Sequence, residues 1–127
     1  MMTDADVILT AERAALDRWS NGDPSGFVEL SDADVVYFDD SVARRVDGLE
    51  ALTALYEKIR GKIHLDRYEL INPKVQVCGD AAVLTCNFVG YAGGKAFPWN
   101  CTEVYRRTDR GWRIIHTHWS VTQHAAP

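Results

Sequence analysis

The chain has 127 residues, of which 46% are hydrophobic and 25% charged, and its formal net charge is −4 at pH 7. This length and composition predict one globular domain with a single core, spanning residues 1–127. A net negative charge is not typical of proteins that bind nucleic acid nonspecifically, because such proteins present a basic face. The sequence also lacks an apolar run of about eighteen residues, so we expect no membrane-spanning segment and no membrane partner.

The N-terminal segment and the cysteines both suggest where the protein resides. Residues 1–19 carry early acids and no apolar core, so we expect no secretory signal. Cys78, Cys86 and Cys101 are odd in number and form no C-x-x-C pattern. We interpret them as buried free thiols, which are typical of a reducing cytoplasm, and we therefore predict a cytoplasmic location. A cysteine nucleophile is the alternative interpretation.

The first helix is predicted between Thr3 and Asn21-Gly22, which ends it. Thr3 and Asp6 resemble a capping box, in which each side chain bonds the backbone N–H of the other residue. Apolar residues then recur at three- and four-residue spacing, which places them on one face of a helix. These residues are Ile8, Ala11, Ala15 and Trp19.

Two further helices are predicted from their N-terminal residues. Asp23-Pro24 combines an N-cap with proline at the first helical position, and it predicts a short helix to about Leu30. Asp47 and Glu50 form a second capping-box pattern, and Gly61 is the predicted stop of the helix that follows. The apolar stripe of this third helix consists of Leu52, Leu55, Tyr56 and Ile59.

The remaining elements are predicted to be strands. Short strands are expected at 35–38 and 44–46, and long ones at about 63–78, 81–92, 96–107 and 112–122. Pro73 has no N–H to donate, so it predicts a bulge or an edge position in the first long strand. Helices followed by a meander of long antiparallel strands predict an α+β fold. Strands of this length must twist and bend, so we expect the sheet to wrap around the helices and leave a conical cavity.

The last two strands form a hairpin whose register can be predicted from its loop. A three-residue loop, Asp109-Arg110-Gly111, places glycine at the position that favours a left-handed backbone. Because side chains alternate between the two faces, this loop fixes which residues share a face. One face then pairs Tyr105 with Ile115, Glu103 with Thr117 and Cys101 with Trp119. The other face pairs Val104 with His116 and Thr102 with His118.

Short motifs that follow one another along most of the chain carry a resemblance to a known family. They are Ser20-Asn21-Gly22-Asp23, Val46-Asp47-Gly48-Leu49, Asn72-Pro73, Gly79-Asp80, Ala92-Gly93-Gly94, and Trp112-Arg113-Ile114-Ile115-His116-Thr117-His118-x-Ser120. On these motifs the chain resembles the nuclear transport factor 2-like superfamily, in its SnoaL-like branch. It is most similar to the association domain of calcium/calmodulin-dependent protein kinase II and its small bacterial relatives. The resemblance implies a cone-shaped half-barrel with an internal pocket and a homodimer built through the sheet.

This chain departs from the kinase domain at the pocket. The positions that match the arginines of that domain are Thr85, Glu103 and Trp119. Arginines suit carboxylate ligands, whereas a hydroxyl, an acid and an indole do not. We therefore expect the pocket to bind a small neutral, aromatic or cationic molecule, and no cofactor is predicted. The large ring of Trp119 is also expected to fill part of the pocket.

Asp39 and Asp40 follow the first strand at the place where the ketosteroid isomerases of this superfamily carry a general-base aspartate. The resemblance favours Asp39 as the counterpart. The oxyanion tyrosine of those isomerases belongs on the first helix, where this chain has Ala15 or a neighbour. Another tyrosine could substitute, and the sequence selects none of Tyr37, Tyr56, Tyr68, Tyr91 and Tyr105. The alternative is a solvated turn without chemistry.

His116 and His118 point to one side of their strand, about 7 Å apart, so they could share a metal ion. No convincing third ligand lies on that face, so no metal site is predicted. Because this face points away from the expected pocket, we interpret the two histidines as residues of a dimer interface.

Glu103 is the other candidate catalytic residue, because a carboxylate on the pocket face needs a partner or a raised pKa. An internal ion pair is the structural alternative. Three functions remain open: binding of a small molecule, an isomerase, cyclase or dehydratase with Asp39 or Glu103 as base, and a non-catalytic oligomerisation module. The expected pocket-lining residues are Trp19, Tyr37, Tyr56, Thr85, Trp99, Thr117 and Trp119.

Overall fold

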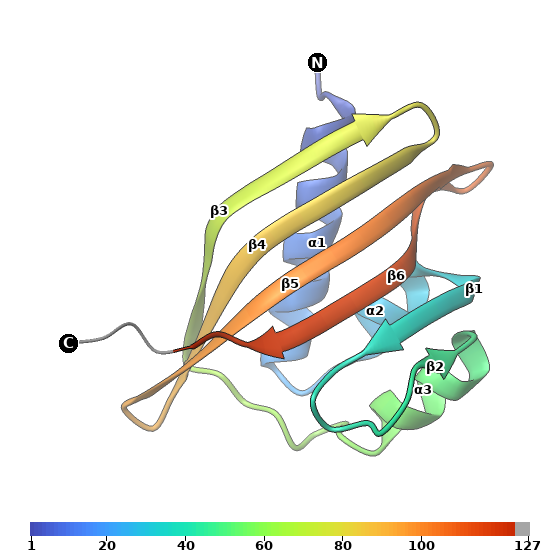
Figure 1. Ribbon diagram of the computed structural model, residues 1–127. Coiled ribbons are helices and arrows are strands. Elements are labelled where there is room, and N and C mark those ends of the chain that lie inside the picture. Colours follow the sequence, from blue (N-terminus) through green and yellow to red (C-terminus); the bar gives the residue numbers. More distant parts are fainter. Residues whose placement is uncertain (124–127) are drawn as a thin grey trace.

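The computed structural model describes residues 1–123, which form three helices and one six-stranded sheet (Figure 1). The sheet has the strand order β2-β1-β6-β5-β4-β3. Strands β1 and β6 are parallel and all other neighbours are antiparallel, so the sheet is mixed. The elements are α1 (Asp4–Ser20), α2 (Ser25–Leu30), β1 (Ser31–Phe38), β2 (Val46–Asp47), α3 (Leu49–Glu57), β3 (Arg67–Cys78), β4 (Ala81–Ala92), β5 (Lys95–Thr108) and β6 (Gly111–Val121).

Figure 1 shows the sheet as one bent, unclosed layer, with α1 lying across its concave face. The predicted α+β fold with N-terminal helices against a bent mixed sheet is therefore confirmed. The capping box of α1 is also present, since the Thr3 hydroxyl accepts from the Asp6 N–H and the Asp6 carboxylate accepts from the Thr3 N–H. No helix among the described residues is both long and apolar enough to cross a membrane.

The predicted boundary of the third helix is wrong at both ends. Asp47 does not cap α3, because it belongs to β2 and its carboxylate accepts a hydrogen bond from Arg45. The N-cap is Gly48, whose φ of 89° suits glycine. Gly61 does not stop the helix directly either, since α3 ends at Glu57 and a series of turns follows.

The predicted irregularity at Pro73 is confirmed. The register of β3 against β4 shifts between Ile71 and Lys74, and Asn72 has a φ of 47°. Strand β3 also lies at the edge of the sheet. A proline is accommodated there because it interrupts no hydrogen bonds to a second neighbouring strand. The strand begins at Arg67, four residues later than predicted.

The last hairpin has the predicted pairs near the site but a different loop. Thr108 pairs with Gly111, so the loop is Asp109-Arg110, and Gly111 has a φ of 91°. The register shifts by one residue between Val104 and Tyr105, so that Tyr105 pairs with Ile114 and not with Ile115. Beyond this bulge the remaining four pairs are those predicted: Val104–His116, Glu103–Thr117, Thr102–His118 and Cys101–Trp119.

The core lies between the concave face of the sheet and the three helices. Its buried residues come from every layer and include Ile8 and Leu16 of α1, Leu52 of α3, Leu84 of β4 and Ile114 of β6. The three cysteines are free, as predicted, but only Cys101 is buried. Cys78 is exposed because it ends the edge strand β3.

Candidate functional site

A pocket of about 380 Å³ opens on the concave side of the sheet. Its wall combines residues of α1, α2, β1, α3, β4, β5 and β6 with the segment 63–65 that precedes β3. This volume lies in the usual range of small-molecule sites. The lining residues are Leu16, Trp19, Phe27, Tyr37, Asp39, Tyr56, Ile63, His64, Leu65, Phe88, Gly90, Ala92, Phe97, Trp99 and Trp119.

The aromatic rings of the wall pack edge to face against one another. The ring centroids of Trp19 and Tyr56 lie 5.3 Å apart, and those of Tyr37 and Tyr56 lie 5.6 Å apart with planes at 90°. Phe88 and Trp119 form a similar pair at 5.6 Å. Such contacts hold each ring in one orientation. Trp119 therefore forms part of a fixed wall and leaves the 380 Å³ pocket open beside it.

Asp39 is the only carboxylate among the described residues that line the pocket. Its Oδ2 accepts a hydrogen bond of 2.6 Å from the Tyr37 hydroxyl. Its Oδ1 accepts from the Ser41 N–H at 2.7 Å and from the Ser41 hydroxyl. A carboxylate has about four acceptor positions, so these three donors leave little free capacity. They also hold the carboxylate in place at the wall.

A second acidic group lies behind the pocket wall and consists of Glu12 on α1 and Glu103 on β5. The two residues are 1% and 0% exposed. The Tyr105 hydroxyl donates to Glu12 Oε1 at 2.6 Å, and the Thr117 hydroxyl donates to Glu103 Oε2 at 3.1 Å. Neither carboxyl group forms a salt bridge with a described residue, and Glu103 Oε1 is buried without a conventional donor. We call these two residues the carboxyl pair.

Burial raises the pKa of both members of the carboxyl pair, because the interior disfavours a charged carboxylate. The neighbouring charge of Glu12 raises the pKa of Glu103 further. The hydrogen bond from Tyr105 acts in the opposite direction on Glu12, but burial outweighs it. The two carboxyl groups therefore titrate as one coupled pair that holds a proton more firmly than two separate glutamates do.

Comparisons with known proteins place this architecture in a family. The sequence profile of the SnoaL-like domain matches residues 8–124. The chain belongs to the SnoaL-like family. A solved protein from Parabacteroides distasonis ATCC 8503 with the provisional name ketosteroid isomerase is 43% identical, with a TM-score of 0.86 over 94% of this chain and 88% of that one. A search of curated proteins gave no match.

More distant structures share the fold of this SnoaL-like chain. A nuclear transport factor 2-like protein of unknown function from Pseudomonas putida KT2440 is 24% identical, with a TM-score of 0.84 over all of both chains. The CaMKII hub of S. rosetta is 22% identical, with a TM-score of 0.78 over 96% of this chain and 99% of that one. The predicted resemblance is confirmed, because the chain has a SnoaL-like domain and shares its fold with a nuclear transport factor 2-like protein and a CaMKII hub.

The SnoaL-like pocket brings together only some of the residues singled out in the sequence. Asp39 and five of the seven expected lining residues contribute to its wall: Trp19, Tyr37, Tyr56, Trp99 and Trp119. Glu103 and Thr117 face inward but belong to the carboxyl pair and its surroundings. Thr85 does not line the pocket, because Leu84 beside it points into the core and Thr85 pairs with Thr102.

Glu12, which lies behind the pocket wall of the SnoaL-like site, was not singled out in the sequence. It lies between Ile8 and Leu16 at four-residue spacing, so it occupies the buried stripe of α1. A charged residue within an apolar helical stripe was the available signal. The internal ion pair that was the alternative for Glu103 is not formed with Arg45 or Arg113, because Arg45 pairs with Asp47 and Arg113 donates to the Glu29 carbonyl.

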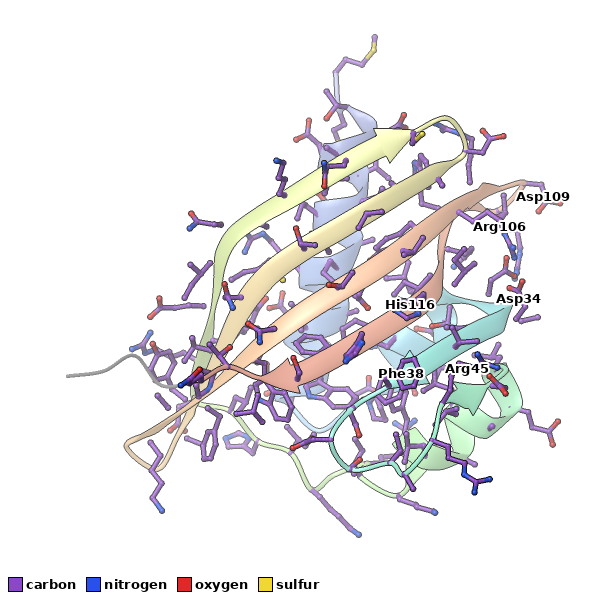
Figure 2. The ribbon with its side chains drawn as sticks, viewed as in Figure 1. Asp34, Phe38, Arg45, Arg106, Asp109 and His116 are labelled. Carbon is purple, nitrogen blue, oxygen red and sulfur yellow. The ribbon has the colours of Figure 1, made fainter. Side chains whose placement is uncertain are left out.

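The two histidines lie on the opposite, convex face of the SnoaL-like sheet. Figure 2 shows His116 and Phe38 near each other on the side turned away from α1. The ring of His118 lies 5.3 Å from that of Phe38 and 6.4 Å from that of His116. Burial and the neighbouring His118 lower the pKa of His116. The described residues contain no cluster of three or more side chains suited to a metal ion.

Proposed function

We propose that this SnoaL-like protein binds a small, largely apolar, ring-shaped molecule in its pocket, and that the ligand is neutral or cationic. The observation that carries this proposal is a 380 Å³ pocket with one carboxylate and eight aromatic side chains in its wall. Flat apolar ligands gain both burial and ring contacts in such a site. The aromatic residues are Trp19, Phe27, Tyr37, Tyr56, Phe88, Phe97, Trp99 and Trp119.

The charge preference follows from the residues of the wall. No lysine or arginine is among the described lining residues, and His64 is the one basic side chain there, so an anionic ligand would find little counter-charge beside Asp39. A cation would be attracted by the Asp39 carboxylate and by the faces of the aromatic rings. We therefore expect the pocket to bind cationic and neutral molecules more tightly than anionic ones.

A matched naphthalene series tests this order by isothermal titration calorimetry. We expect 2-naphthylmethylammonium and 2-naphthylmethanol to bind, and 2-naphthoate to bind at least about tenfold more weakly, which corresponds to about 1.4 kcal/mol. Asp39→Asn should reduce the advantage of the cation over the alcohol, whereas Asp40→Asn, next to it but outside the lining, should not. Absence of binding across the series, or tightest binding of 2-naphthoate, would contradict the proposal.

A second candidate is an acid–base enzyme that uses Asp39 as general base. It is favoured by the 43% identity with a protein that carries the provisional name ketosteroid isomerase. In this reaction Asp39 would take a proton from a carbon beside a carbonyl group and return it to another carbon, so that no atom is gained or lost. Deuterium exchange into a pocket-bound ketone, measured by NMR, separates this candidate from binding alone.

Self-association through the convex face is the third part of the proposal, as a homodimer. The central positions of this face carry no acid, lysine or arginine, which suits a buried interface. Charged pairs such as Arg106–Asp34 lie toward its end, near the hairpin loop (Figure 2). The central residues are Val36, Phe38, Val83, Thr85, Thr102, Val104, His116 and His118.

Acidification should weaken such a dimer. Burial and His118 already lower the pKa of His116 in the single chain, and burial in the interface would disfavour its charged form further, so the dimer loses stability as the pH falls through that pKa. We expect multi-angle light scattering to show a dimer at pH 8 and a larger monomer fraction at pH 5.5. The variant His116→Gln/His118→Gln should lose this dependence, whereas His64→Gln should keep it. A dimer fraction that stays constant from pH 8 to pH 5.5 would contradict the role of the histidines.

A cytoplasmic location is also part of the proposal. It is supported by the three cysteines, which are all free. Free thiols persist in a reducing compartment, whereas secreted proteins commonly oxidise them.

A further inference from the structure

Two cysteines on neighbouring strands lie directly opposite each other. Strands β4 and β5 run side by side (Figure 1), and their register pairs Cys86 with Cys101. Cys86 lies between the buried residues Leu84 and Phe88 at two-residue spacing, so its side chain shares their concave face. Its directly opposed partner Cys101, which is buried, lies on the same face. We call these two residues the dithiol.

The spacing of the dithiol suits a disulfide. Directly opposed residues of an antiparallel pair have Cα atoms about 4.5–5.5 Å apart. A disulfide spans Cα distances of about 4.4–6.8 Å, so the backbone already holds the two residues within bonding range. The pairing of β4 with β5 continues without a register shift on both sides of the dithiol, which keeps this spacing fixed.

The two thiols differ in access and in acidity. Cys86 is half-buried, and the register shift between Ile71 and Lys74 leaves it without a directly paired residue on β3. Cys101 is 3% exposed. The neighbouring Cys101 thiol lowers the pKa of Cys86, and the charge of Arg13 on α1 acts in the same direction, whereas burial opposes both. The Cys86 thiol and burial raise the pKa of Cys101. Cys86 is therefore the more reactive thiol.

We infer that the dithiol is a peroxide-reactive site, at which a hydroperoxide oxidises Cys86 and Cys101 then closes a disulfide within the same chain. The site lies on the face opposite to the proposed dimer surface, so dimerisation leaves it accessible. The next pair on the same face, Phe88 and Trp99, lines the pocket, so the modification takes place beside the pocket wall. In a reducing compartment such a disulfide is transient and reversible.

The reaction balances in two steps. The Cys86 thiolate attacks one oxygen of the hydroperoxide and the O–O bond breaks, which gives a sulfenic acid at Cys86 and an alkoxide that takes up a proton to become an alcohol. The Cys101 sulfur then attacks the sulfenic sulfur, and the hydroxyl group leaves with the thiol proton as water. The two thiols lose two electrons and two protons, and the hydroperoxide is reduced to the alcohol and water.

Hydrogen peroxide tests the inference on the variant Cys78→Ser, in which Cys86 and Cys101 are the only cysteines left. After an about tenfold excess of peroxide, we expect intact-protein mass spectrometry to show the loss of two hydrogen atoms and no alkylation by iodoacetamide in urea. Trypsin should then release peptides 75–95 and 96–106 as a linked pair that separates on reduction. The exposed Cys78 ends an edge strand, so its replacement should leave the fold intact.

Two double variants separate the roles of the thiols. Cys78→Ser/Cys101→Ser should still react but stop at the sulfenic acid of Cys86, which dimedone labels. Cys78→Ser/Cys86→Ser should react at least about tenfold more slowly, because Cys101 is buried and its pKa is raised. Circular dichroism before the treatment shows whether each double variant is folded.

The variant Cys78→Ser decides the inference even if a double variant does not fold. If it keeps two alkylatable thiols after peroxide, or if its disulfide joins two chains on a non-reducing gel, the inference is wrong. It is also wrong if Cys101 alone reacts as fast as Cys86 alone, because the dithiol then has no attacking and resolving member.

Discussion

The free energy of unfolding should decrease as the pH rises from about 5 to 8, because the carboxyl pair keeps a proton that the unfolded chain releases. A glutamate of an unfolded chain titrates near pH 4.3. In the folded protein, burial raises the pKa of Glu103 well above its usual range, and the charge of Glu12 raises it further. The protonated Glu103 therefore contributes its full stabilisation below the pKa of the unfolded chain. This contribution is lost as the pH rises from that pKa to the higher pKa of the folded protein.

Wherever the folded protein holds one proton more than the unfolded chain, the free energy of unfolding falls by about 1.4 kcal/mol per pH unit. Urea denaturation followed by circular dichroism measures this slope directly. No salt bridge of the described residues reaches either member of the carboxyl pair, so nothing nearby offsets the cost of ionising both.

Glu103→Gln provides the decisive comparison. The amide can donate to Glu12 and does not titrate, so the variant should be more stable than the wild type at pH 8 and less sensitive to pH. Glu50→Gln, at an exposed position of α3, should follow the wild-type curve. Subtracting the curves of wild type and Glu103→Gln cancels the histidines, whose titration is common to both. Equal slopes for the two proteins would show that the carboxyl pair does not hold an extra proton.

The last hairpin shows how far sequence reasoning reaches. The alternation of side chains, together with glycine at the loop, places Glu103 opposite Thr117 and Trp119 on the same inward face. The predicted loop was one residue too long, and a register shift between Val104 and Tyr105 compensates for it. Register near the site was therefore predictable, because the pattern of buried residues constrains it more strongly than the loop does.

The pocket was less predictable because its wall joins elements that are distant in sequence. The aromatic residues Trp99 and Trp119 were expected there, since their strands and faces follow from alternation. Glu12 was not, because its partner Glu103 lies on a strand ninety-one positions away, and only the packing of α1 against the sheet brings the two together. Thr85 was misplaced because a position matched to a relative does not by itself fix the face of a strand.

The backbone of Gly22 lies tightly against the segment that leads into the pocket wall, so a substitution at Gly22 should strongly affect stability. Gly22 follows α1 with a φ of 82°, and its carbonyl accepts from the Gly61 N–H at 2.8 Å. The preceding Ser20 carbonyl accepts from the Leu65 N–H at 2.9 Å. These two bonds hold both ends of the segment 61–65, and residues 63–65 of this segment line the pocket.

Gly22→Ala should destabilise the protein by about 2–5 kcal/mol, because it combines left-handed backbone strain with a steric clash. The added Cβ would lie 3.1 Å from the Gly61 Cα and 3.1 Å from the Ile63 carbonyl oxygen, and both are backbone atoms that cannot rotate away. Gly79→Ala is the matched control, since Gly79 also has a positive φ, of 61°, but its added Cβ would meet nothing within 4 Å. The control should lose only about 1–2 kcal/mol in urea denaturation.

The difference between the two variants isolates the contact between the α1–α2 turn and the pocket wall. If the 61–65 segment must shift to accommodate the methyl group, Gly22→Ala should also bind 2-naphthylmethanol at least severalfold more weakly than Gly79→Ala does. Since residues 63–65 form one side of the pocket, a change in their position alters its shape without altering any side chain. Equal stability losses for the two variants would mean that strain alone acts at Gly22. A stability difference with unchanged binding would mean that the turn supports the fold and not the site.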